Sequence, residues 1–71
     1  MIRIRLNDSA ALEELRATLA ASDYSTARVD DATLLVTHPL AIDEGQARVE
    51  LGFYLKAWGV AHPGVDAELL G

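Results

Sequence analysis

The stretch VDAELL, residues 65–70, decides the fold of this chain, because it can be interpreted in two ways. As a strand, it points its three odd-numbered apolar residues to one face and its two carboxylates to the other. As a short helix, it gathers Val65, Leu69 and Leu70 on one face. The strand completes a βαββαβ order of elements, and we therefore prefer it.

The N-terminal segment supports this choice. Residues 2–6, with the sequence IRIRL, alternate apolar and basic side chains, which is typical of a half-buried strand. If the first and last strands are neighbours, the outward Arg3 and Arg5 lie beside the outward carboxylates of the last strand. These carboxylates are Asp66 and Glu68, and opposite charges on adjacent strands contribute about 0.2–1 kcal/mol per pair. We predict that the last strand pairs with the first.

Helix-capping and turn residues divide the intervening chain. Leu12, Leu15 and Leu19 recur at helical spacing, so the first helix buries a leucine stripe. Asp43 and Gln46 form a variant of the capping box at the start of a second helix. The predicted elements are strand 2–6, helix 9–21, a hairpin with arms 26–29 and 33–37 around an Asp30-Asp31 turn, helix 43–60 and strand 65–70.

This order of elements resembles the ferredoxin-like superfamily of folds. The resemblance covers nearly the whole chain and implies one α+β domain over residues 1–71, an open-faced sandwich with two helices on one face of an antiparallel sheet. The fold hosts metal chaperones, amino-acid-sensing ACT domains, RNA-recognition modules, acylphosphatases and oligomerising adaptors. The resemblance therefore implies an architecture and no single function.

Composition restricts the partners and the location. The formal charge of −5 weighs against nucleic acid and anionic membranes as partners. The chain has no cysteine, which removes disulfides, thiolate metal ligands and cysteine nucleophiles. We see no signal peptide and no apolar run long enough to cross a bilayer, so we expect a cytoplasmic protein. A small domain without such staples often gains stability by association.

The sequence lacks the residues that the known activities of this fold require. A metal chaperone would need a cysteine pair after the first strand, and His38 and His62 have no recognisable ligand spacing. His62 precedes a Pro-Gly pair at a helix end, where a cationic side chain suits the terminal carbonyls. RNA recognition would need aromatic residues on the exposed sheet face. The predicted outward positions contain none: Arg3, Arg5, Thr33, Leu35, Thr37, Asp66 and Glu68.

Catalysis is not expected either. None of the three serines lies in a nucleophile-elbow context, and no glycine motif could cradle a phosphate. We predict a protein that is not an enzyme and has no metal and no cofactor. An ACT-like regulatory domain is the alternative, with a ligand loop at Asn7, Asp8 and Ser9, although helix capping by itself explains these residues.

The second helix is apolar on two faces. One face is the natural core stripe and comprises Ala47, Leu51, Tyr54, Leu55 and Trp58. The other lies nearly opposite and comprises Val49, Phe53, Ala57 and Val60. A surface helix of a monomer has no reason to be apolar on both faces, so this pattern indicates that something outside the domain covers the second one.

Three glycines accompany the second apolar face. Gly45, Gly52 and Gly59 recur every seven residues and therefore stack along the helix. Each interior glycine costs about 1 kcal/mol of helix stability relative to alanine. Three explanations stay open: close packing against the first helix, an interface with another chain, or chance.

We therefore predict a protein-interaction module that forms a homodimer, or docks a protein partner, through the outer face of the second helix. The sheet edge at residues 27–29 could add strand pairing between subunits. The predicted interface residues are Val49, Gly52, Phe53, Ala57, Gly59 and Val60.

Overall fold

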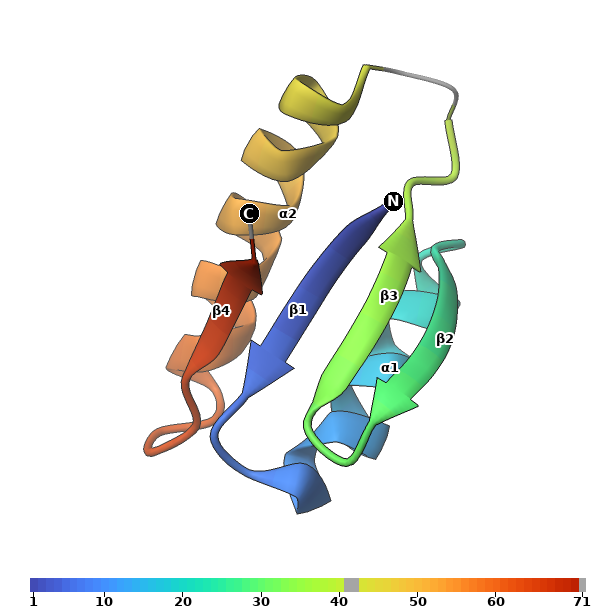
Figure 1. Cartoon of the computed structure of the whole chain (residues 1–71). Helices are drawn as coiled ribbons and strands as arrows, with labels where there is room; N and C mark the ends of the chain where they lie inside the picture. The colour runs from blue at the N-terminus through green and yellow to red at the C-terminus, as the bar shows by residue number, and fades with distance from the viewer. Residues whose placement is uncertain (41–42, 71) are drawn as a thin grey trace.

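The computed structural model describes residues 1–40 and 43–70 and has the order βαββαβ (Figure 1). The elements are β1 (Ile2–Leu6), α1 (Ser9–Ala21), β2 (Ser25–Asp30), β3 (Thr33–Thr37), α2 (Glu44–Val60) and β4 (Ala67–Leu70). The last segment is thus a strand, and the helical alternative for it is wrong. Both helices begin where the capping residues predict, because Asp8 accepts a hydrogen bond from the Ala10 amide and Asp43 accepts one from the Gln46 amide.

The four strands form one antiparallel sheet in the order β2-β3-β1-β4, which is the ferredoxin-like topology. Figure 1 shows both helices on the same face of this sheet, so the other face is open. The predicted fold class is confirmed. Residues at the two ends of the chain are neighbours in the sheet, as the complementary charge patterns of the first and last strands indicate.

The core lies between the sheet and the two helices. The buried apolar residues come from β1, α1, β3 and α2, whereas β2 and β4 contribute none, and the leucine stripe of α1 is fully buried. Of the predicted core stripe of α2, only Tyr54 is half-buried instead of buried. The buried apolar residues are Ile2, Ile4, Leu6, Ala11, Leu12, Leu15, Leu19, Leu34, Val36, Ala47, Leu51, Leu55 and Trp58.

The register of β4 on β1 confirms half of the predicted charge match. Arg5 lies opposite Glu68, as expected. Arg3 lies opposite Leu70, so the expectation that it faces a carboxylate is wrong. The reason is the register, which places Leu70 opposite Arg3, while Asp66 lies before the ladder and bonds to Asn7.

Asp66 is held just before β4 by the β1–α1 connection. The Asn7 amide donates to the Asp66 carbonyl at 3.2 Å, and the Asp66 amide donates to the Asn7 side-chain oxygen Oδ1 at 2.8 Å. Asn7 Nδ2 also donates to the Gly64 carbonyl at 3.1 Å. One side chain therefore fixes the turn that leads into β4, and the regular ladder starts after Asp66.

The β2–β3 hairpin differs from the prediction in two details. The turn lies at Asp31 and Ala32, one residue later than predicted, because the Asp30 carboxylate accepts a bond from the Ala32 amide at 2.9 Å. Thr33 faces the open side beside Arg5, yet it is only 3% exposed, so the prediction of a solvated Thr33 is wrong. The bond from the Ala32 amide, followed by one from the Thr33 side chain, keeps the pKa of Asp30 below its usual value.

Candidate functional site

The outer face of α2 carries an apolar stripe that no other part of the described structure covers. The side chains of Val49, Phe53 and Val60 are 59%, 71% and 82% exposed, and Ala57 between them is exposed as well. These three make up half of the six large apolar residues that are exposed in residues 1–40 and 43–70. We call Val49, Phe53, Ala57 and Val60 the outer stripe.

The outer stripe is rigidly presented. Packing of Leu51, Leu55 and Trp58 on the sheet turns the opposite face of α2 towards solvent. On the α1 side, the Tyr54 hydroxyl donates to the Thr18 carbonyl at 3.1 Å. On the β4 side, Arg48 Nη1 donates to the Leu70 carbonyl at 2.9 Å. The helix is therefore anchored on both flanks, which favours docking without rearrangement.

Two of the glycines of α2, Gly52 and Gly59, lie on the side of the helix next to β4. A methyl group at Gly52 would lie 4.0 Å from Leu69 Cδ1, and one at Gly59 would meet nothing within 4 Å. At Gly45 it would meet only the capping side chain of Asp43, at 3.1 Å. The hypothesis that the glycines receive the first helix is therefore wrong, because no atom of α1 lies within 4 Å of a methyl group placed at any of them.

A groove of about 660 Å³ follows the glycines on this flank. Its α2 wall has Gly52 and Gly59, where side chains are missing, and its other wall is the approach to β4 and β4 itself. Val60 belongs both to the groove and to the outer stripe, so the two surfaces are continuous. The lining residues are Gly52, Leu55, Lys56, Gly59, Val60, Val65, Asp66, Ala67, Glu68 and Leu69.

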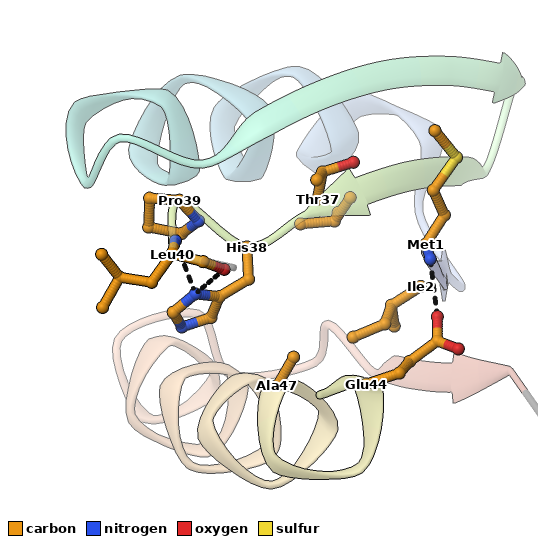
Figure 2. Close-up of a pocket in the computed structure, with 9 residues that line it drawn as sticks. Met1, Ile2, Thr37, His38, Pro39, Leu40, Glu44 and Ala47 are labelled. Atoms are coloured by element: carbon orange, nitrogen blue, oxygen red, sulfur yellow. Dashed lines mark hydrogen bonds and ion pairs between the residues drawn. The ribbon is translucent and has the colours of Figure 1, made fainter. Parts of the chain in front are cut away.

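A smaller pocket of about 330 Å³ opens at the other end of α2 (Figure 2). Its apolar lining includes Ile2, Val36 and Ala47. The amino group of Met1 and the Glu44 carboxylate lie 2.6 Å apart and form an ion pair that keeps the pKa of Glu44 below its usual value. The pocket offers both apolar contacts and polar groups, so it could hold a small molecule that carries groups of both kinds.

His38 borders this pocket with both ring nitrogens engaged. Its Nδ1 accepts a bond from the Leu40 amide at 3.0 Å, and its Nε2 contacts the Glu50 carboxylate. The ring of Tyr24 packs edge-on against it at 5.3 Å. Burial raises the pKa of the Tyr24 hydroxyl, and the nearby Glu50 raises it further. This arrangement positions the end of β3 and favours the structural interpretation of His38.

His62 joins the end of α2 to α1. Its Nδ1 lies 2.8 Å from the Trp58 carbonyl, its Nε2 lies 3.0 Å from Glu14 Oε1, and its ring stacks on the Trp58 ring at 4.0 Å. When the ring is protonated, both nitrogens donate to these acceptors. The bond to Glu14, followed by the bond to Trp58, raises the pKa of His62. The prediction that His62 satisfies a terminal carbonyl of the helix is confirmed.

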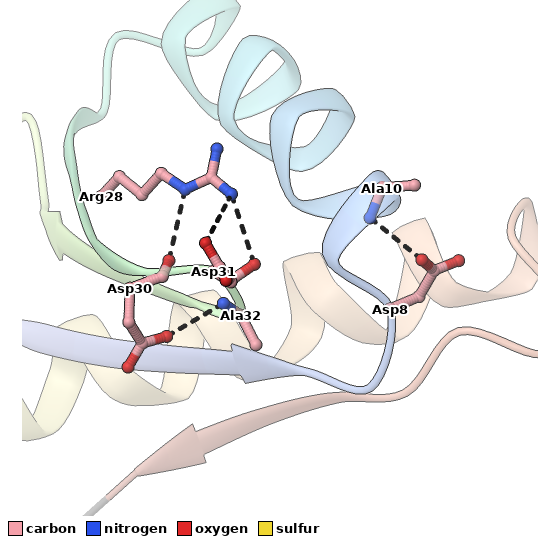
Figure 3. A network of polar contacts seen from close by, with 6 residues as sticks. All are labelled: Asp8, Ala10, Arg28, Asp30, Asp31 and Ala32. Atoms are coloured by element: carbon pink, nitrogen blue, oxygen red, sulfur yellow. Dashed lines mark hydrogen bonds and ion pairs between the residues drawn. The ribbon is translucent and has the colours of Figure 1, made fainter.

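The proposed ligand loop uses two of its three side chains internally. Asn7 fixes the turn before β4, as described above, and Asp8 caps α1 (Figure 3). Only Ser9 is exposed without such a bond among the described residues. Sequence reasoning missed the role of Asn7, because its partners are more than 50 residues away and only the return of the chain to β1 brings them together.

Several other comparisons bear on the site. In the parts of the chain that the structure describes, no three His, Cys, Asp or Glu side chains gather into a potential metal site, and no helix is long and apolar enough to cross a membrane. No protein-family model, curated protein or solved structure matches the chain. The surface of α2 and its groove are therefore the features on which a functional proposal can rest.

Proposed function

We propose that this protein is a non-enzymatic interaction module that forms a homodimer through the outer stripe of α2. The exposure of Val49, Phe53 and Val60 on one face of an anchored helix carries the proposal. Burying a large apolar side chain contributes about 1.5–3 kcal/mol, and a phenylalanine at the centre of the stripe is the natural anchor.

The size of the chain makes self-association favourable. A domain of about this size buries only about 60% of the surface of its unfolded chain, so its own core supplies limited stability. A standard interface buries about 800 Å² per partner. This is about a fifth of the 4316 Å² accessible surface of the described chain, so the contact would include residues beside the outer stripe, such as the predicted Gly52 and Gly59.

Sedimentation equilibrium on three proteins tests the proposal. The parent should dimerise, and Phe53→Asp should be monomeric, because the dimer would bury an unpaired carboxylate. Ala17→Asp is the matched control, since it adds the same charge at an exposed position of α1, and it should dimerise like the parent. A parent that stays monomeric at millimolar concentration, with Phe53→Asp equally stable, would rule out self-association.

We keep one second candidate, a small-molecule-sensing domain with an ACT-like layout. The pocket next to His38 favours it, whereas Asn7 and Asp8 are already bonded internally. A thermal-shift screen of the parent with amino acids and nucleotides tests it, because a ligand that binds only the folded state stabilises it by RT ln(1 + [L]/Kd). The absence of any shift across the panel would reject this candidate.

A further inference from the structure

The strand β4 lies at the edge of the sheet, and no residue that the structure describes bonds to its outer backbone groups. On its inner side, the Asn7 amide points to β4, whereas the Leu6 amide points to β3 and donates to the Ala32 carbonyl. Backbone groups alternate in direction along an antiparallel ladder. Since Asp66 faces Asn7, the amide and carbonyl groups of Ala67 and Leu69 point away from β1. A further strand could pair with these groups.

The groove lies directly beside this edge. Val65, Ala67 and Leu69 pack against the core and stay half-buried, because the facing wall of α2 has glycines at positions 52 and 59. The inward side chains of an added strand could enter this space. A free edge with an open apolar groove next to it is the geometry by which sheets bind extended peptides.

The opposite edge of the sheet is less suited to pairing. The register of β2 shifts between Arg28 and Asp30, and Arg28 donates to the carbonyls of Asp30 and Asp31 across the hairpin turn (Figure 3). Bulges and charged side chains are devices that block pairing at an edge. The prediction that the edge at residues 27–29 pairs between subunits thus meets a bulge, whereas the register of β4 on β1 is unbroken.

The side chains that suit a partner strand follow from β4 and from β1, the strand that already pairs with it. On the open face, Asp66 and Glu68 are exposed, and neither forms an ion pair among the described residues. On the inner side, β1 places Arg5 opposite Glu68 and Ile4 opposite Leu69. A strand on the outer side would meet the same alternation of acidic and apolar groups.

We infer that the free edge of β4 and the adjoining groove bind an extended peptide segment of a partner protein, in which apolar and basic residues alternate. The segment adds a fifth strand next to β4. Its apolar side chains fill the groove along Gly52 and Gly59, and its basic side chains lie beside Asp66 and Glu68. The groove adjoins the outer stripe and shares Val60 with it, but the inference does not require the homodimer.

Fluorescence anisotropy with a labelled seven-residue peptide of alternating isoleucine and arginine tests the inference. The titration uses the Phe53→Asp protein, so that self-association cannot mask the groove. We expect saturable binding, and binding about tenfold weaker or worse for a peptide with glutamate in place of arginine, because like charges then face each other. In ¹H–¹⁵N spectra, the amides of Ala67 and Leu69 should shift with the same saturation curve.

A pair of leucine substitutions locates the site. Gly59→Leu, added to Phe53→Asp, should abolish peptide binding, because it fills the groove at a position where an added methyl meets nothing within 4 Å. Ala57→Leu adds the same side chain to the outer stripe and should leave binding unchanged. Far-ultraviolet circular dichroism confirms that both variants keep their helices.

Three results would overturn the inference: no saturable binding, equal binding of the acidic peptide, or unchanged binding by Gly59→Leu. The two proposals fail independently. If the parent proves to be monomeric, the peptide titration stays valid. If the titration shows no binding, the sedimentation result stays valid.

Discussion

Individual side chains connect segments of this protein that are far apart in the sequence. Asn7 spans to Gly64 and Asp66, and His62 spans to Glu14 across the two helices. Both residues are polar and lie at the ends of elements, where backbone groups lack partners within the helix or sheet. Each of them holds a connection between elements in place. The sequence of that connection does not by itself show which part of the protein it contacts.

The free energy of unfolding should depend on pH through His62. Its pKa is raised in the folded state above the usual value of 6.5, so the stabilisation is complete below that value and is lost as the pH rises through the folded-state pKa. Glu14→Gln removes the main cause of the shift and should reduce this loss. Urea unfolding between pH 5 and about 9, with an NMR titration of the His62 ring, measures the effect.

Glu13, the residue before Glu14, provides the control for the pH dependence. Glu13 pairs with Arg16 and has no bond to His62, so Glu13→Gln should leave the pH dependence above 6.5 unchanged. Equal behaviour of the two glutamine variants would contradict the assignment of the shift to the Glu14 contact.

At the scale of elements, α2 has one well-buried face, but the glycines within the helix lower its intrinsic stability. Its apolar face is continuous from Ala47 to Trp58, yet glycines interrupt the adjoining flank. Tertiary packing, rather than intrinsic helix propensity, thus stabilises this helix. The flank without side chains is available for contact with another chain, which is the basis of the peptide-binding proposal.

Gly52→Ala should therefore stabilise the domain by about 1 kcal/mol, the difference in helix propensity between the two residues. The new methyl would lie 4.0 Å from Leu69 Cδ1, which is an ordinary contact. Gly64→Ala is the matched control. Gly64 has a φ of 90°, which alanine adopts poorly, so this variant should be destabilised instead. Chemical denaturation measures both, and a destabilised Gly52→Ala would show that the flank is less open than its geometry indicates.

At the scale of the whole molecule, the sandwich leaves three surfaces available for association: the open sheet face, the outer stripe and the β4 edge. If the outer stripe forms a homodimer, stability must depend on protein concentration, because only the folded chains associate. The Tm of the parent should rise as the protein is concentrated from about 1 µM to about 1 mM, whereas the Tm of Phe53→Asp should stay constant. Differential scanning calorimetry measures both, and parallel curves would contradict the dimer.

The sequence by itself determined the order and type of the elements, because these depend on short-range patterns. These patterns involve residues only a few positions apart in the sequence. Examples are the alternation in residues 2–6, the capping residues Asp8 and Asp43, and the leucine spacing of α1. The same patterns identified the outer stripe, since a helix with two apolar faces is recognisable without knowledge of its surroundings. The homodimer and the absence of catalysis stay predictions.

Only the tertiary structure decided which neighbours these elements meet. The glycine flank of α2 faces β4 because the crossover places α2 beside that strand, and helical periodicity gives a direction around the helix axis but no partner for it. The burial of Thr33 and the register that pairs Arg5 but not Arg3 with a carboxylate have the same origin. Contacts between segments far apart in the sequence depend on how the chain closes on itself, and the register of β4 on β1 decides which charges lie opposite each other.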